Sequence, residues 1–553
     1  MFIFLCAATF AEPLYGLGDL SSFSMSGRSD FRIRYRMSDR LELNFEETHP
    51  RLHDHIEQIE KFNLLFDSSD TKIRLQFDQV GFMLNKYILD EKLKYSWDLL
   101  DNTVEAPFND LYWIVEKFTI EKQIGRLSIG LGDVYASFGR GIALNVIQNT
   151  KVDIDTSIRG SLLHYEADDW ELIGITGFTN KQQIQRYNPN LAINQDIPHF
   201  VMGTEYKRYG LLDGMMSLGA HTVFSSFGDT LDGSPLLRWE EGFDSSVTGV
   251  DLEISGLWDI DWYVEGDLFH YSDTKMQGED GPWGYALYGS ASIYTDPAIF
   301  LVEVKQSKDT ERINSYTFAD QWEIATPPTL EYERVITEDS AAAVNSNDVT
   351  GARIKADIIV DNPNLKPYIA VSMLRDRDLT GLHFNKSPES IVHPVVGFKY
   401  TPSGTLIMLN GGYRQDHRDE GDLHDHLVHV DAEFSKELPG DNGIELNISA
   451  WNFIWGDDTH YDFLEMQNAL VWRRGEHWDF IIYQDWSNNT QLTSIGNFTR
   501  ELYGAFETKY KPNSKEEFRI LMGAYKAGIR CSGGQCRILP GFKGFEFAYR
   551  KDF

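Results

Sequence analysis

The chain has 553 residues, and its 51 Lys and Arg against 84 Asp and Glu give a formal net charge of −33. So acidic a chain is a poor general partner for nucleic acid, which is bound by basic surfaces. Aromatic residues make up 13% of the chain, which disfavours disorder, and the absence of a long apolar run after the N-terminus excludes a helical membrane protein. A large β-rich protein remains, either soluble or a membrane barrel.

Residues 1–11 are predicted to be an export signal. They form a short apolar stretch with Thr9 and Ala11 at the −3 and −1 positions of a cleavage site. The alternative is a buried N-terminal strand. Cleavage would remove Cys6 and leave residues 12–553 as the mature protein, with an even pair of cysteines.

Apolar and polar residues alternate along most of the chain. A period of two predicts strands with one apolar and one polar face. The clearest alternating segments are 31–36, 41–46, 73–78, 250–255, 300–305 and 444–449. Many predicted strands are about ten residues long, which is the length that crosses a bilayer at a tilt.

The predicted connections alternate between tight and long. The tight set is 295–297, 361–364, 402–404, 439–442, 475–477 and 512–514. The long polar set is 179–198, 225–245, 272–282, 306–349, 375–390, 414–423, 454–460 and 488–498. Outer-membrane barrels have short periplasmic turns and longer external loops. We therefore predict an all-β, transmembrane, antiparallel up-and-down barrel of about 24–26 strands, in which the larger number requires a further strand at 15–25.

The C-terminal strand predicts an assembly signal. Its aromatic residues share one face: Phe545, Phe547, Tyr549 and Phe553. A terminal aromatic preceded by alternating aromatics resembles the signal that the barrel-assembly machinery of Gram-negative bacteria recognises. The expected surroundings are then outer-membrane lipid and lipopolysaccharide. An ordinary amphipathic edge strand is the alternative.

Three motifs carry a resemblance to a known family. They are Gly-Asp-Val-Tyr-Ala-Ser-Phe-Gly-Arg-Gly at 132–141, Pro-Pro-Thr-Leu-Glu at 327–331, and Cys-Ser-Gly-Gly-Gln-Cys-Arg at 531–537. Together they resemble a family of bacterial outer-membrane β-barrels found in Bacteroidota and related Gram-negative lineages. The resemblance implies a fold and a location, and it supplies no activity, substrate or catalytic residue.

The candidate chemistry is sparse. His424, Asp425, His426, His429 and Asp431 are possible metal ligands, but on a strand His424 and His426 face away from the other three. We see no nucleophile elbow or other catalytic signature, so we expect no enzyme activity and no catalytic residue.

Charged residues near the N-terminus predict a ladder inside the lumen. Arg32, Arg34 and Arg36 share one face of their strand, and Glu42 and Glu46 share a face of the next alternating segment. A hairpin over 37–40 would pair these charges across the two strands. They would either constrict the pore or simply hold the strands in register.

Two further predictions concern external loops. Cys531 and Cys536 are expected to form a disulfide in the last loop, because the protein is exported to an oxidising compartment. The acidic loop 306–349 and the trio Asp457, Asp458 and Asp462 offer oxygen ligands for weak Ca²⁺ binding, together with lipopolysaccharide. Solvated acidic loops are the alternative.

The Gly-rich segment 132–156 is predicted to fold into the lumen and narrow it. Asp133, Tyr135, Arg140 and Arg159 are the expected constriction residues, with Asp133 and Arg140 exposed to the solute. The alternative is a further membrane hairpin. The function favoured by the sequence is a porin-like channel for a polar solute, with no resident cofactor. A non-transporting scaffold that docks a surface or periplasmic partner protein is the second hypothesis.

Overall fold

The computed structural model describes residues 24–37, 55–84, 111–149, 154–155, 157–179, 200–227, 243–272, 282–310, 349–376, 390–418, 423–455, 461–488, 502–525, 528–532, 535–539 and 542–553. The predicted export signal, the alternating segment 41–46, the Pro-Pro-Thr-Leu-Glu motif and most of the acidic loop 306–349 lie outside these residues.

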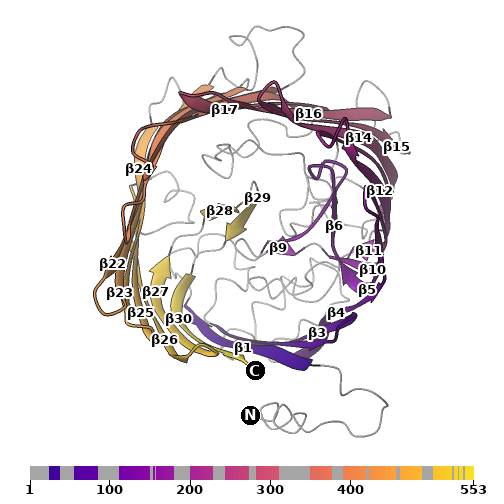
Figure 1. Cartoon of the computed structure of the whole chain (residues 1–553). Coiled ribbons are helices and arrows are strands. Elements are labelled where there is room, and N and C mark those ends of the chain that lie inside the picture. Colours follow the sequence, from indigo (N-terminus) through magenta and orange to yellow (C-terminus); the bar gives the residue numbers. More distant parts are fainter. Residues whose placement is uncertain are drawn as a thin grey trace, which may run out of the picture.

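One antiparallel sheet of 24 strands closes into a ring (Figure 1). The described residues contain strands and no helix. The ring consists of β1 (Ser24–Arg36), β2 (His55–Asp67), β3 (Thr71–Leu84), β4 (Leu111–Ile124), β5 (Leu127–Val134), β10 (Ile158–Glu166), β11 (Trp170–Thr179), β12 (Phe200–Leu211), β13 (Met216–Phe227), β14 (Phe243–Leu257), β15 (Ile260–Tyr271), β16 (Trp283–Tyr294), β17 (Ala298–Lys308), β18 (Val349–Ile358), β19 (Leu365–Asp376), β20 (Ser390–Tyr400), β21 (Thr405–Arg418), β22 (Leu423–Leu438), β23 (Asn442–Trp455), β24 (Tyr461–Arg474), β25 (Trp478–Ser487), β26 (Leu502–Asn513), β27 (Glu516–Tyr525) and β30 (Phe542–Asp552).

Each barrel strand pairs with the strands before and after it, and β1 pairs with β30 to close the ring. The prediction of an all-β barrel is therefore confirmed, at the lower end of the expected strand number. The expected further strand at 15–25 is wrong as a barrel element. A single strand, β1, already begins at Ser24 and continues through the alternating segment 31–36, so β30 pairs directly with it.

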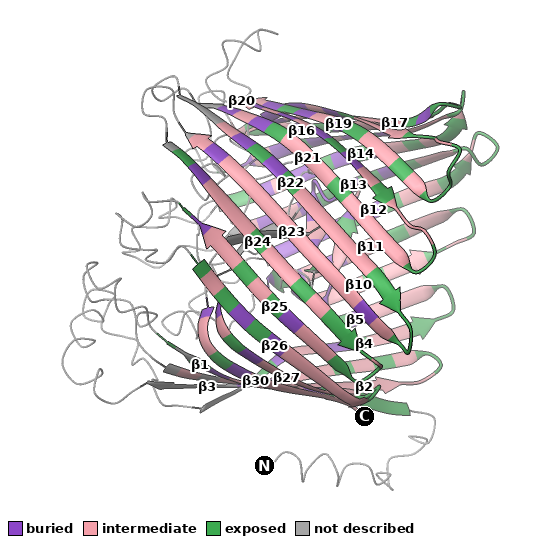
Figure 2. Ribbon diagram, turned by 90° about the vertical axis from the view of Figure 1, so that its left-hand side faces the viewer, coloured by how far each residue is buried: buried purple, intermediate pink, exposed green. Residues whose placement is uncertain are grey.

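Tight and long connections alternate around the ring, as the sequence predicts. The six tight turns expected from the sequence all join paired strands, for example 295–297 between β16 and β17, and 475–477 between β24 and β25. These turns gather at one end of the barrel, on the right in Figure 2, where the C-terminus also lies. Some strands extend further than the sequence predicts, so the connections between them are shorter. The connection expected at 306–349 comprises residues 309–348, and the one expected at 414–423 comprises residues 419–422.

The two faces of the wall differ in chemistry. Apolar side chains such as Leu218, Val250 and Val264 are about half exposed on the outside of the ring. Their neighbours in sequence turn inward and include polar residues such as Asp251 and Glu265, which are almost fully buried. Figure 2 shows exposed and buried residues interspersed among intermediate ones along the tilted strands. Strict alternation thus gives an apolar exterior and a largely polar interior.

Four short strands lie outside the barrel sheet. They are β6 (Ala136–Phe138), which pairs with β7 (Leu144–Val146), β8 (Gln148–Asn149), which pairs with β9 (Ile154–Asp155), and the hairpin of β28 (Gly528–Ser532) with β29 (Gln535–Leu539). Viewed along the barrel axis, β6, β9, β28 and β29 project inside the ring (Figure 1). Within the described part of the chain, no helix is long and apolar enough to cross a membrane.

Candidate functional site

Residues 135–149, here called the inward segment, lie against the inner face of the wall rather than within it. The segment leaves the end of β5 and folds back as the hairpin of β6 and β7, inside the ring (Figure 1). Gly139 and Gly141 have φ of 55° and 86°, which is backbone that glycine adopts at no steric cost. The sheet passes from β5 directly to β10, so residues 141–146 are not a further membrane strand.

Apolar side chains hold the inward segment in place. Phe138, Ile142 and Leu144 have at most 1% of their surface exposed, in one cluster with inward-facing residues of β10 to β16. Gly203 of the wall makes room for Phe138, because a Cβ there would lie 2.7 Å from the phenyl ring. Burying such a side chain contributes about 1.5–3 kcal/mol. Several of them together make the segment a fixed element of the lumen.

Two backbone hydrogen bonds tie the tip of the inward segment to buried carboxylates of the wall. The amide of Gly139 donates to Oε1 of Glu205 at 2.9 Å, and the amide of Arg140 donates to Oε2 of Glu265 at 2.7 Å. The fit is close, because a Cβ on Gly139 would lie 2.1 Å from Oε1 of Glu265. The turn Gly139–Arg140 therefore needs glycine at its first position for space as well as for backbone conformation.

Two of the predicted constriction residues, Arg140 and Tyr135, are at least partly exposed in the interior of the barrel. The side chain of Arg140 is exposed, and its guanidinium carbon lies 4.5 Å from the centre of the Tyr263 ring. Tyr135 is partly exposed and accepts a hydrogen bond of 2.8 Å from the Lys117 ammonium. The inward segment thus presents a cation and a phenol to the interior of the barrel.

The other two predicted constriction residues form an ion pair behind the segment. Only 1% of Asp133 is exposed, so the prediction that it faces the solute is wrong. Its Oδ2 accepts from the Phe118 amide at 2.8 Å and from Nη2 of Arg159 at 3.2 Å. The cause is register: Asp133 lies directly opposite Arg159 on neighbouring strands, so the two side chains meet on the same face. Arg159 also donates to the carbonyl of Glu116 at 2.7 Å.

Beneath the tip of the inward segment lies a group of five polar side chains, here called the carboxylate–histidine cluster. Two rows of directly paired residues build it. The first row runs Glu205, His221, Gly249, Asp267 across β12 to β15, and the second runs Gly219, Asp251, Glu265 across β13 to β15. All five polar side chains, Glu205, His221, Asp251, Glu265 and Asp267, are at least 94% buried, with exposures of 1%, 3%, 6%, 0% and 4%.

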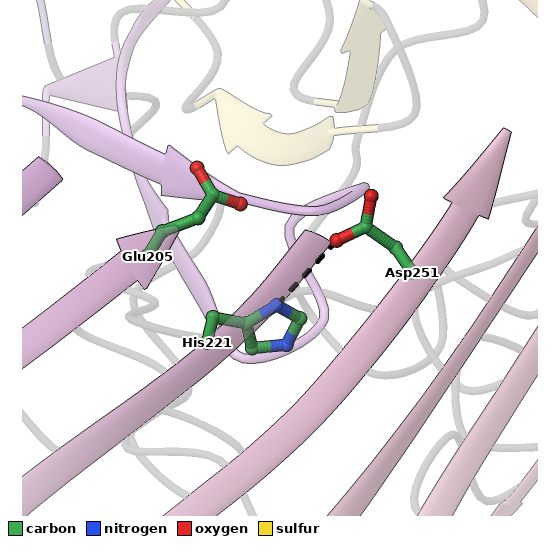
Figure 3. Close-up of side chains that lie close together, drawn as sticks. All are labelled: Glu205, His221 and Asp251. Atoms are coloured by element: carbon green, nitrogen blue, oxygen red, sulfur yellow. Dashed lines mark ion pairs between the residues drawn. The ribbon is translucent and has the colours of Figure 1, made fainter. Parts of the chain in front are cut away.

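Glycines in the two rows let the polar side chains converge. The Nε2 of His221 reaches Oδ1 of Asp267 at 2.6 Å across Gly249, where a Cβ would lie 2.2 Å from that oxygen. In the same way, Asp251 leans over Gly219, where a Cβ would lie 1.9 Å from its Oδ2. Figure 3 shows Glu205, His221 and Asp251 pointing toward one another from three adjacent strands. Each glycine replaces a side chain that would block the approach.

The cluster carries more negative charge than its own polar contacts offset. Four carboxylates face one histidine, the Lys207 ammonium at 3.2 Å from Glu205, and the Arg140 guanidinium over Tyr263. Every member of the cluster keeps one buried atom without a hydrogen-bond partner among the described residues: Oε2 of Glu205, Nδ1 of His221, Oδ2 of Asp251, Oε1 of Glu265 and Oδ2 of Asp267. Such atoms are costly inside a protein, and natural structures contain few of them.

Sequence reasoning missed this cluster, although a signal was available. Three successive strands carry glycine two positions before an ionisable residue that faces the same way: Gly203 and Glu205, Gly219 and His221, Gly249 and Asp251. The repeat becomes meaningful only when the register aligns the three strands side by side. That register depends on the tight turns, whose exact lengths the sequence did not define.

The predicted ladder between Arg32, Arg34, Arg36 and the pair Glu42 and Glu46 is wrong in its partner strand. β1 pairs with β2 and β30, and the expected hairpin over 37–40 is replaced by a connection that runs to His55. Arg34 forms an ion pair with Glu546 of β30, and Arg32 lies 3.7 Å from the same carboxylate. Arg36 ends β1, and its side chain, like Glu42 and Glu46, lies outside the described residues.

The remaining predicted residues are dispersed over the barrel. On β30, Phe545 is 41% exposed and Glu546 is buried, so the aromatic face points outward and the polar face inward. The ring of Phe553 stacks on Phe62 with 5.6 Å between centroids. Cys531 and Cys536 lie directly opposite each other in the register of β28 and β29. Their side chains are outside the described residues.

The two metal-ligand sets considered in the sequence do not assemble among the described residues. His429 faces inward with Nδ1 at 3.0 Å from Asp431, whereas Nδ1 of His426 is hydrogen-bonded to the Tyr413 hydroxyl at 2.6 Å outside the ring. The side chains of His424 and Asp425 lie outside the described residues. Of the proposed calcium trio, Asp462 is exposed on β24, and Asp457 and Asp458 are outside the described residues.

No family model and no curated protein matches this chain, so the resemblance to a barrel family stays a prediction. Solved structures of similar shape include the copper transporter OprC, 10% identical over 96% of this chain and 80% of that chain, with a TM-score of 0.43. The siderophore receptor PirA from Acinetobacter baumannii is 8% identical over 96% and 80%, with a TM-score of 0.46. The P pilus usher PapC translocation pore is 8% identical over 96% and 99%, with a TM-score of 0.38. None of these likenesses assigns a function to this chain.

Proposed function

We propose that this chain is an outer-membrane β-barrel of a Gram-negative bacterium that forms a channel for a polar solute. The observation that carries the proposal is the contrast between the two faces of the closed wall. Large apolar side chains from Val115 on β4 to Phe545 on β30 are exposed outside, and ionisable residues from Arg34 to Glu546 are buried on the inside. An exterior of this kind suits lipid, and an interior of this kind suits water and ions.

The width of the barrel also supports a channel. Barrels of 16–18 strands leave an aqueous passage, and wider ones are either open or plugged. In this barrel of 24 strands, the inward segment covers the wall from β10 to β16 and presents Arg140 to the interior. We infer that the segment narrows the passage and that Arg140 contacts the solute. The net charge of −33 favours cations at the mouths of such a channel.

Conductance measurements test the proposal. We would compare wild type, Arg140→Ala and a deletion of 135–142 as purified, folded barrels in a planar lipid bilayer. We expect a cation-selective channel in wild type, a changed reversal potential in Arg140→Ala and a larger conductance in the deletion. Equal behaviour of all three would show that the segment is no constriction. The absence of any conductance would contradict the channel and favour a scaffold that docks a partner protein.

A further inference from the structure

We propose that Glu205, His221 and Asp251 form a binding site for a divalent first-row transition-metal ion such as Zn²⁺, beneath the inward segment. One nitrogen or oxygen atom of each of the three residues lies within 4.8 Å of the others. Atoms that bind one zinc ion tetrahedrally at about 2.1 Å lie about 3.4 Å apart, so side-chain shifts of about 1 Å would complete the site. This inference stands on the cluster itself and does not depend on the channel function.

The hydrogen bonding of His221 leaves a ligand atom facing a carboxylate. The carboxylate of Asp267 only accepts, so Nε2 of His221 donates in the 2.6 Å bond between them. In the neutral ring Nδ1 then carries a lone pair, and it faces Oδ2 of Asp251 at 3.9 Å (Figure 3). Two lone pairs directed at each other repel unless a proton or a metal ion lies between them. A metal ion at this point would bind both atoms.

The surrounding residues match those of a metal site in two further respects. The partner of Nε2, Asp267, fixes the orientation and tautomer of the imidazole, as carboxylates beside metal-bound histidines do. The two carboxylate oxygens of Glu205 have different surroundings. Oε1 accepts from the amide of Gly139 and from Lys207, whereas Oε2 has no partner among the described residues. Oε2 is therefore available as the third ligand.

A second group, made by His221, Glu265 and Asp267, also brings its ligand atoms within 4.8 Å. We favour the first group because, in the second, Asp267 is already hydrogen-bonded to Nε2 of His221. Glu265 also accepts from Tyr263 at 2.6 Å and from Arg140 at 2.7 Å through Oε2. Its role is then to add negative charge close to the ion and to hold the inward segment.

The ligand set favours zinc-like ions over calcium. One imidazole and two carboxylates are common ligands of Zn²⁺, whereas Ca²⁺ takes six to eight oxygen ligands. A water molecule enclosed beneath the inward segment would supply the fourth position. Because Glu205 would bind the ion through Oε2 and the inward segment through Oε1, the bound ion would also stabilise the docked segment. Ion binding and segment docking therefore share one carboxylate.

The test is zinc binding to the purified, folded barrel in detergent, measured by equilibrium dialysis and elemental analysis. We expect one Zn²⁺ per wild-type barrel that a hundredfold excess of Ca²⁺ does not displace. The isosteric variants Glu205→Gln and Asp251→Asn, and His221→Ala, should weaken binding at least tenfold. The matched control is His270→Ala, which removes a histidine of β15 that faces away from the cluster.

A second measurement reads the coupling between the ion and the inward segment. Zn²⁺ should slow tryptic cleavage after Arg140 in wild type and in His270→Ala, but not in Asp251→Asn. Mobility in unheated gels reports folding, and if His221→Ala does not fold, the two isosteric variants decide the question. The proposal is overturned if wild type binds no zinc, or if Glu205→Gln and Asp251→Asn bind it as tightly as wild type does.

Discussion

The guanidinium of Arg34 on β1 donates a hydrogen bond of 2.5 Å from Nε to Oε2 of Glu546 on β30, across 512 residues of chain. Both side chains are almost fully buried on the inner face of the wall. Arg519 of the neighbouring strand β27 pairs with the other oxygen of Glu546. One buried carboxylate thus links the first strand and the last two strands of the barrel, at the seam where the ring closes.

We predict that Glu546→Gln destabilises the barrel strongly. Removing one partner from a buried charged network leaves its arginines uncompensated, which costs about 3–5 kcal/mol. The control is Asp552→Asn, which breaks the exposed pair between Arg28 and Asp552 on the same two strands and should cost about 0–1 kcal/mol. Urea unfolding of both variants in detergent measures the difference. Equal losses would show that the seam does not depend on its buried charges.

The second prediction concerns the tight turn at Gly139, which holds the inward segment against the wall. We expect Gly139→Ala to detach the inward segment from the wall, because the new Cβ would lie 2.1 Å from Oε1 of Glu265 and the φ of 55° disfavours alanine. Trypsin should then cut after Arg140 faster than in wild type. Gly174→Ala is the control, since a Cβ at that position meets nothing within 4 Å. Identical cleavage of the two variants would contradict the docking described here.

We predict that a substitution at Asp133 affects the stability of the barrel, whereas one at Arg140 affects ion conduction. Asp133→Asn should lower the free energy of unfolding by about 1–3 kcal/mol, since it weakens the buried contacts to Arg159 and Phe118. It should leave ion selectivity unchanged, because only 1% of Asp133 is exposed. Arg140→Ala should change ion selectivity and leave the free energy of unfolding unchanged. Unfolding curves and reversal potentials of both variants measure this, and a selectivity change in Asp133→Asn would restore Asp133 to the constriction.

The predicted disulfide between Cys531 and Cys536 also has a direct test. Directly opposite residues of antiparallel strands have Cα atoms about 4.5–5.5 Å apart, within the range that a disulfide spans. We expect the unreduced mature protein to take up no thiol-alkylating reagent at these cysteines, and two equivalents after reduction. Mass spectrometry measures the added mass. Labelling of both cysteines before reduction would contradict the bond.

The C-terminal residue Phe553 contributes a packing contact and is also part of the predicted assembly signal, and an experiment can distinguish these two roles. Phe553 stacks on Phe62, so Phe553→Ala should lower the stability of the refolded barrel by about 1 kcal/mol. If Phe553 is also part of an assembly signal, the same variant should accumulate far less folded barrel in the outer membrane than this loss explains. The control is Phe62→Ala, which removes the same contact and leaves the C-terminus intact. Equal membrane levels of the two variants would argue against the signal.

The barrel itself followed from the sequence because alternation and turn chemistry are local. The segment 250–255 and the turn 475–477 each carry their own evidence in a few residues, and both are where they were expected. The strand number was uncertain because β1 starts seven residues before the clear alternation at 31–36, in a stretch of serine and glycine whose pattern is weak.

The partners of side chains were much harder to predict, because they depend on register over long distances. Arg34 was expected to meet an acidic residue in the next predicted strand, and its carboxylate comes instead from the far end of the chain. His221 and Asp251 are 30 positions apart and become neighbours only through the register of β13 and β14. The sequence did identify the inward segment through its glycines, but not the wall residues that receive it.

The pairing of β1 with β30 has a consequence for the order of folding. The tightly connected hairpins join strands close in sequence, and such local contacts form early because little chain has to be closed. The pairing of β1 with β30, by contrast, joins strands from the two ends of the chain. For a flexible chain, closing a loop of some 500 residues costs about 5–6 kcal/mol in entropy, and prior formation of the intervening hairpins removes most of that cost. The pairing of β1 with β30 should therefore form last in assembly, after the hairpins that lie between the two strands in sequence.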